Sequence, residues 1–190
     1  MTNTENERMT WSTVRKELQA QDHATLLSLI KKLYDSSKEN RDFIHANCFE
    51  DEVGGAVLAG YRRRIIKQFF PARGIGKLKL SEARKAIRDY GRATGNVSGI
   101  AELMMVYVEN GVQFTRQYGD IDERFYSSVE SVLSELEQLF HTDARPLYPE
   151  FKDRLTRIEQ LSSGIGWGFH DYISEVVWLL EKNLGDERSS

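Results

Sequence analysis

The segment from Val97 to Tyr118 restricts the possible folds most, because apolar residues occur on every side of the helix that its spacing predicts. These residues include Ile100, Ala101, Leu103, Met104, Met105, Val106, Tyr107 and Val108. Glu109 and Gln113 are the polar exceptions. A helix that is apolar all round has to be surrounded by other elements. The sequence therefore predicts a central helix over this segment.

Helical spacing of apolar residues recurs on both sides of this segment. Residues 50–70 and 121–141 each predict one long helix, and no segment alternates like a strand over a useful length. The connections between the expected helices are short, and 190 residues suit one domain. The prediction is an all-α, single-domain helical bundle or a short stack of helical hairpins, with about eight or nine helices.

The ends of the chain are expected to lie outside this domain. Residues 1–9 and 185–190 are predicted to be disordered tails, and residues 10–184 to form the single helical domain. Three helices are expected near residues 12–20, 22–34 and 38–47. The first two are expected to pair, and the third to add Phe43 and Ile44 to the same core.

Cysteine content and hydropathy indicate a compartment. Cys48 is the only cysteine, which excludes an intrachain disulfide and a thiolate zinc site. The first eight residues are polar, and no apolar run is long enough to cross a bilayer. These features predict a cytoplasmic protein without a membrane partner and without a cofactor.

The charge is distributed unevenly along the chain. Residues 61–92 carry eleven Lys and Arg against two Asp and Glu, whereas residues 93–188 carry eight against seventeen. The overall charge of −3 therefore conceals a basic middle and an acidic C-terminal half. Such an uneven charge distribution indicates which kinds of binding partner the chain could attract.

The first candidate site is this basic segment. Its residues are Arg62, Arg63, Lys67, Arg73, Lys77, Arg84, Lys85 and Arg88. They could dock an acidic protein or nucleic acid, or they could neutralise the acidic half within the fold or between subunits. An acidic protein with a pI near 5.9 is unusual for a general nucleic-acid binder. Gly74, Gly76 and Lys77 do not have the spacing of a phosphate-binding loop.

The second candidate site combines carboxylates, aromatic residues and one histidine near two glycine turns. Its residues are Glu109, Tyr118, Asp120, Asp122, Glu123, Tyr126, Trp167, His170 and Asp171. Helix caps and core packing are the favoured interpretation, with Asp120 as an N-cap and Glu123 completing a capping box. The alternative is a hard-metal site with oxygen ligands in a metal-assisted hydrolase. The spacing of these residues along the chain does not by itself indicate a metal site.

Several stretches resemble a known family. Tyr107-Val-Glu-Asn-Gly-Val-Gln-Phe-Thr, Tyr118-Gly-Asp-Ile-Asp-Glu-Arg-Phe-Tyr and Ile165-Gly-Trp-Gly-Phe-His-Asp are similar to segments of an uncharacterised bacterial family, a domain of unknown function. The resemblance spans about residues 12–180 and is consistent with a helical fold. It implies no activity and assigns no functional residue.

The sequence favours a non-enzymatic interaction module over an enzyme. Its basic face, residues 62–92, is expected to dock an acidic protein or nucleic acid. Metal-assisted hydrolysis at the carboxylate and histidine turns is the alternative. Whether the chain forms homo-oligomers stays open.

Overall fold

The computed structural model describes residues 10–49 and 52–185, and these residues are helical without any strand. The helices are α1 (Trp11–Gln19), α2 (His23–Ser36), α3 (Lys38–Cys48), α4 (Glu52–Phe69), α5 (Leu80–Thr94), α6 (Val97–Tyr118), α7 (Glu123–His141), the 3-10 turn η1 (Arg145–Leu147), α8 (Tyr148–Ser162) and α9 (Phe169–Leu184). The all-α prediction is confirmed. The predicted tails lie outside the described residues, except for Gly185, whose N–H donates to the carbonyl of Glu181 at 2.8 Å.

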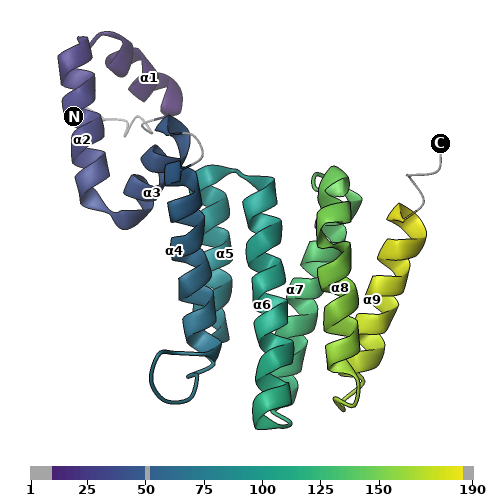
Figure 1. The fold of residues 1–190 in the computed structure, drawn as a ribbon. Coiled ribbons are helices and arrows are strands. Elements are labelled where there is room, and N and C mark those ends of the chain that lie inside the picture. The colour runs from purple at the N-terminus through teal and green to yellow at the C-terminus, as the bar shows by residue number, and fades with distance from the viewer. Residues whose placement is uncertain (1–9, 50–51, 186–190) are drawn as a thin grey trace, which may run out of the picture.

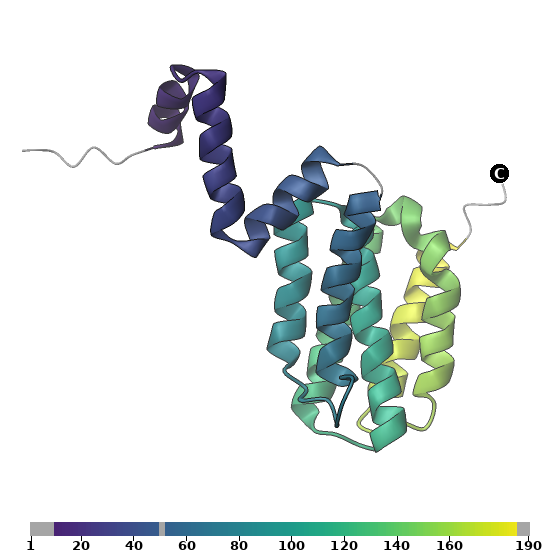
Figure 2. The same ribbon diagram turned by 60° about the vertical axis from the view of Figure 1, so that its left-hand side comes forward.

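Helices α4 to α9 form three successive antiparallel pairs that stand side by side (Figure 1). One layer contains α4, α6 and α8, and the other contains α5, α7 and α9. Figure 2 shows the same two layers from another side. The arrangement is the stack of helical hairpins that the sequence offers as one form of the fold.

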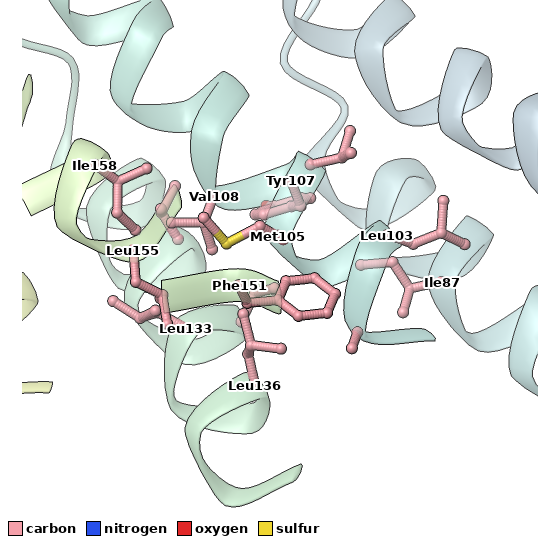
Figure 3. Close-up of a cluster of buried hydrophobic side chains, with 14 of the residues drawn as sticks. Ile87, Leu103, Met105, Tyr107, Val108, Leu133, Leu136, Phe151, Leu155 and Ile158 are labelled. Carbon is pink, nitrogen blue, oxygen red and sulfur yellow. The ribbon is translucent and has the colours of Figure 1, made fainter. Parts of the chain in front are cut away.

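Helix α6 is the centre of this stack, as its all-round apolar sequence predicts. It packs against α4, α5, α7 and α8, and its Leu103, Met105 and Tyr107 are fully buried. Figure 3 shows how side chains of α6 meet those of α7 and α8 in one cluster. Burial of each large apolar side chain contributes about 1.5–3 kcal/mol, so this helix contributes strongly to the stability of the core.

A glycine allows α6 and α7 to approach closely. A Cβ atom at Gly111 would lie 2.7 Å from Cγ2 of Val129, which is closer than two carbon atoms can pack. The two backbones therefore come together at this point because Gly111 has no side chain.

The N-terminal helices differ from the prediction. Helices α1 and α2 contain no buried residue, and they project from one end of the stack (Figures 1 and 2). Only α3 packs on the body, against α4 and α5, and its Phe43 remains half exposed. The expectation that all three helices share the core is wrong, because the extended backbone at Ser37 directs α2 away from the body.

No helix within residues 10–49 and 52–185 is long and apolar enough to cross a membrane. Cys48 is exposed and forms no disulfide in this part of the chain.

Candidate binding site for an anionic partner

Part of the basic segment is neutralised inside the fold. Arg62 Nη1 lies 3.7 Å from Glu102 Oε1 of α6, and Arg84 pairs with Glu135 of α7. Both carboxylates belong to the acidic C-terminal half. For these two arginines, the structure bears out the interpretation that the basic segment balances that half within the chain.

Asp89 neutralises two more cations of the segment. Its Oδ2 atom accepts from Lys85 Nζ at 2.7 Å and from Arg64 Nη2 at 3.3 Å, which ties α5 to α4. Burial alone would raise the pKa of Asp89, but the Lys85 ammonium and the Arg64 guanidinium outweigh it and hold the pKa below its usual value. Arg64 therefore serves the packing of α4 on α5, whereas Lys85 pairs with Asp89 within α5.

The remaining cations are exposed and make no ion pair with the described part of the chain. They are Arg63, Lys67, Arg73, Lys77, Lys79, Arg88 and Arg92. Of the eight predicted basic-site residues, Arg63, Lys67, Arg73, Lys77 and Arg88 belong to this group. The basic segment thus divides into four cations that are paired within the fold and seven that are open to a partner.

Four of the open cations surround one surface hollow between the end of α4 and the start of α5. This α4–α5 hollow has a volume of about 230 Å³ and is lined by Lys67, Gln68, Pro71, Arg73, Ile75, Lys77 and Lys79. No carboxylate lines it. A group that enters the hollow therefore meets positive charge on several sides.

The loop that carries three of these cations folds onto the end of α4. The N–H of Leu78 donates to the carbonyl of Gln68 at 3.0 Å, which folds the loop back on the end of α4. A Cβ at Gly76 would lie only 2.0 Å from the carbonyl oxygen of Phe69, so no other residue fits there. Leu78 has a positive φ of 47°, a conformation that costs about 1–3 kcal/mol outside glycine. These contacts pack the loop against α4, with Arg73 and Lys77 exposed on it.

The hollow also has an apolar side. Ile75 at the tip of the loop is 66% exposed, and Pro71 lines the same hollow. Ammonium and guanidinium groups make charge-assisted hydrogen bonds to carboxylates or phosphates. The combination suits a ligand that carries both anionic and apolar groups.

Glu109 of the second candidate site forms an ion pair with a cation that the sequence does not single out. Arg154 of α8 donates through Nε and Nη2 to the two carboxylate oxygens of Glu109, each at 2.8 Å, and it also pairs with Glu102. Glu109 therefore joins α6 to α8 and lies away from the other residues of its group. Nothing in the spacing of single charges reveals this triad, because its members come from two helices that are distant in sequence.

The predicted cap at the start of α7 is shifted by two residues. Asp122, and not Asp120, is the N-cap, and it accepts from the N–H of Phe125 at 2.9 Å. Glu123 is the first residue of the helix. Asp120 instead accepts a hydrogen bond from the hydroxyl of buried Tyr126 at 3.1 Å. That hydroxyl also meets Thr115 Oγ1 at 2.8 Å, so Asp120 fixes a core tyrosine.

His170 lies on a separate network. Its Nδ1 atom is 2.8 Å from the hydroxyl of Ser162, which is fully buried and donates to the carbonyl of Glu159. Asp171 is exposed in the first turn of α9. Among residues 10–49 and 52–185, no group of three or more His, Cys, Asp or Glu could hold a metal ion. The geometry thus gives the hydrolase hypothesis no support.

Two aromatic residues of the second group are exposed at the loop end of the stack. Tyr118 is 41% exposed and packs on Phe114, and Trp167 is 64% exposed and stacks on Tyr126 with ring centroids 6.4 Å apart. Trp167 has a positive φ of 63°. The α4–α5 loop lies at the same end of the stack (Figure 1).

No family model, curated protein or solved structure matches this chain.

Proposed function

We propose that this chain is a non-enzymatic interaction module that holds an acidic segment of a partner protein at the α4–α5 hollow. The observation that carries the proposal is the set of four exposed cations around one hollow that no carboxylate lines. Because the loop already hydrogen-bonds to α4, binding of a partner should cost little ordering of its backbone.

The composition of the hollow favours an acidic protein over nucleic acid. Ile75 and Pro71 offer apolar contacts that a peptide with alternating acidic and apolar side chains can use. The hollow is small, whereas nucleic-acid binders neutralise phosphates along an extended basic stripe. The carboxylates that pair with Arg62, Arg84 and Lys85 shorten the basic surface of α4 and α5.

Fluorescence anisotropy tests this proposal. A short labelled peptide rich in Glu and Leu is titrated with the protein at low and at physiological salt, beside labelled single-stranded RNA and double-stranded DNA. We expect the peptide to bind, and the double variant Arg73→Glu/Lys77→Glu to weaken its binding by about tenfold or more, which is about 1.4 kcal/mol.

The matched control reverses two exposed cations on α8 and α9, as Arg157→Glu/Lys182→Glu. It makes the same change in net charge and should leave peptide binding nearly unaltered. Equal losses in both variants, or no peptide binding even at low salt, would overturn the proposal. Tighter binding of RNA or DNA, lost in Arg73→Glu/Lys77→Glu alone, would assign the hollow to nucleic acid instead.

A further inference from the structure

Helices α1 and α2, which we call the arm, have the amphipathic pattern of helices that pack against a partner. In α2 the apolar residues occupy an arc of roughly 160° around the helix, and the polar residues occupy the opposite side. The apolar arc contains Leu26, Leu27, Leu29, Ile30, Leu33 and Tyr34. Trp11, Val14 and Leu18 form a similar stripe on α1.

Helix α3 covers only part of this apolar surface, chiefly through the contact of His45 with Tyr34, and most of the surface stays exposed within the described chain. Leu27, Ile30 and Leu33 are 53%, 45% and 51% exposed, and Trp11 is 70% exposed. With Leu29 included, the arm exposes about 500 Å² of large apolar side chains, at roughly 100 Å² for each half-exposed residue. This area lies within the range of the largest apolar patch of an ordinary monomer, about 300–600 Å². In this chain the exposed apolar residues lie on a projecting arm.

The arm gains little stability from burial of its own apolar face. Isolated helices below about 12–15 residues are marginal in water, and their stability in proteins comes from burial of an apolar face. Helix α1 has 9 residues and α2 has 14, and neither contains a buried residue. A surface that covers the apolar arc would supply the missing stabilisation.

The junction between α2 and α3 nevertheless holds the arm in a defined direction. Asn40 Nδ2 donates to the carbonyl of Leu33 at 2.8 Å and to Ser36 Oγ at 3.0 Å. The Tyr34 hydroxyl lies 2.9 Å from His45 Nε2 of α3. Because these contacts join α2 to a helix that packs on the body, the arm is presented to a partner in a prepared orientation.

We propose that the apolar arm pairs with the arm of a second copy of this chain. The exposed apolar area matches the apolar share of the ~800 Å² that each partner contributes to a standard interface. Residues 11–36 carry four Lys and Arg and three Asp and Glu, so each arm has a net charge of only +1 and the repulsion between two arms is small. A two-fold interface requires one self-complementary surface, and a continuous aliphatic stripe flanked by both signs of charge meets that requirement.

The arm lies at the end of the stack opposite the α4–α5 loop (Figure 1). Pairing of two arms therefore leaves both α4–α5 hollows open, and the dimer would present two copies of that surface. The pairing does not depend on the proposed function, since either can hold without the other.

Sedimentation velocity over a wide concentration range tests the pairing. We expect the full chain to sediment as a dimer of twice 21.9 kDa at high concentration. Ile30→Glu places a charge in the apolar arc and should raise the dissociation constant at least about tenfold, which is about 1.4 kcal/mol. Ser28→Glu, two residues away on the polar side of α2, is the matched control and should sediment like the native chain.

Hydrogen exchange of the native chain provides a second readout that needs no variant. Amides of residues 23–36 should exchange more slowly at the concentration where the dimer forms than at the concentration where it dissociates. A native chain that stays monomeric throughout, or a dimer that Ile30→Glu and Ser28→Glu affect equally, would overturn the proposal. So would a dimer in which protection of α2 does not change with dissociation.

Discussion

At the scale of single residues, charge in this protein performs two separate tasks. Arg154 and Asp89 join helices, whereas Lys67, Arg73, Lys77 and Lys79 point to solvent around the α4–α5 hollow. Residue type does not distinguish the two roles. The two roles are distinguished by whether an opposite charge lies nearby in the fold. A single sequence does not reveal this when the opposite charge comes from another helix.

Replacing Arg154 should destabilise the fold. The hydrogen bonds that Arg154 donates to Glu109, together with those it donates to Glu102, raise the pKa of its guanidinium above its already high value. Arg154→Ala leaves two partly buried carboxylates without this partner, and we expect it to lower the free energy of unfolding by about 1–3 kcal/mol. Chemical denaturation measures the change. Arg157→Ala, on an exposed position of the same helix, should change it by less than about 0.5 kcal/mol.

Asp89 should contribute stability that depends on pH. Because its folded pKa is depressed, its contribution is fully present above the unfolded pKa of about 3.9 and is lost as the pH falls through the folded value. Asp89→Asn should therefore be clearly less stable than the native chain at neutral pH, and the difference should shrink below about pH 4. Denaturation curves at several pH values measure it.

The exposed pair of Lys31 and Asp35 on α2 provides the comparison for this experiment. Exposed ion pairs contribute about 0–1 kcal/mol, so Asp35→Asn should show little loss at any pH. A loss in Asp89→Asn that is constant from acid to neutral pH would mean that the ion pair does not contribute.

At the scale of helices, the spacing of apolar residues predicts which face of a helix packs, but it does not always predict the element against which that face packs. The bounds of α6 follow from its apolar run and from Gly119, whose φ of 85° ends the helix after Tyr118. The start of α7 is less certain from sequence, because Asp120 and Asp122 are both good caps. In α2 the apolar residues have the same helical spacing as in the core helices. In this helix, however, that spacing marks a face that the described chain leaves mostly exposed.

Two glycines within helices should respond in opposite directions to the same substitution. Gly111→Ala forces a Cβ against Val129 and should destabilise the protein by about 1–3 kcal/mol. At Gly60 in α4 a Cβ would meet no atom within 4 Å, so Gly60→Ala should stabilise the helix by up to about 1 kcal/mol. Thermal and chemical unfolding of both variants measure the difference. Equal effects would contradict the close packing of α6 on α7.

At the scale of the whole molecule, the three stacked hairpins separate two surfaces with different chemistry. The apolar arm projects at one end, and the α4–α5 loop lies at the other (Figure 1). The class of the fold, the central position of α6 and a basic surface region were predictable from periodicity and charge. The division of the basic region into paired and open cations was not predictable, because Glu102 and Glu135 pair with its arginines from helices that come later in the sequence.

The central claim is that an acidic partner binds at the α4–α5 hollow, and backbone-amide NMR of the deuterated full chain tests it most directly. The spectrum is recorded while the Glu- and Leu-rich peptide is added. The account predicts that the perturbed amides concentrate between residues 67 and 79 and that Arg73→Glu/Lys77→Glu clearly reduces the changes at the same peptide concentration. Perturbations that concentrate elsewhere, or none at a peptide concentration that saturates the anisotropy signal, would contradict it.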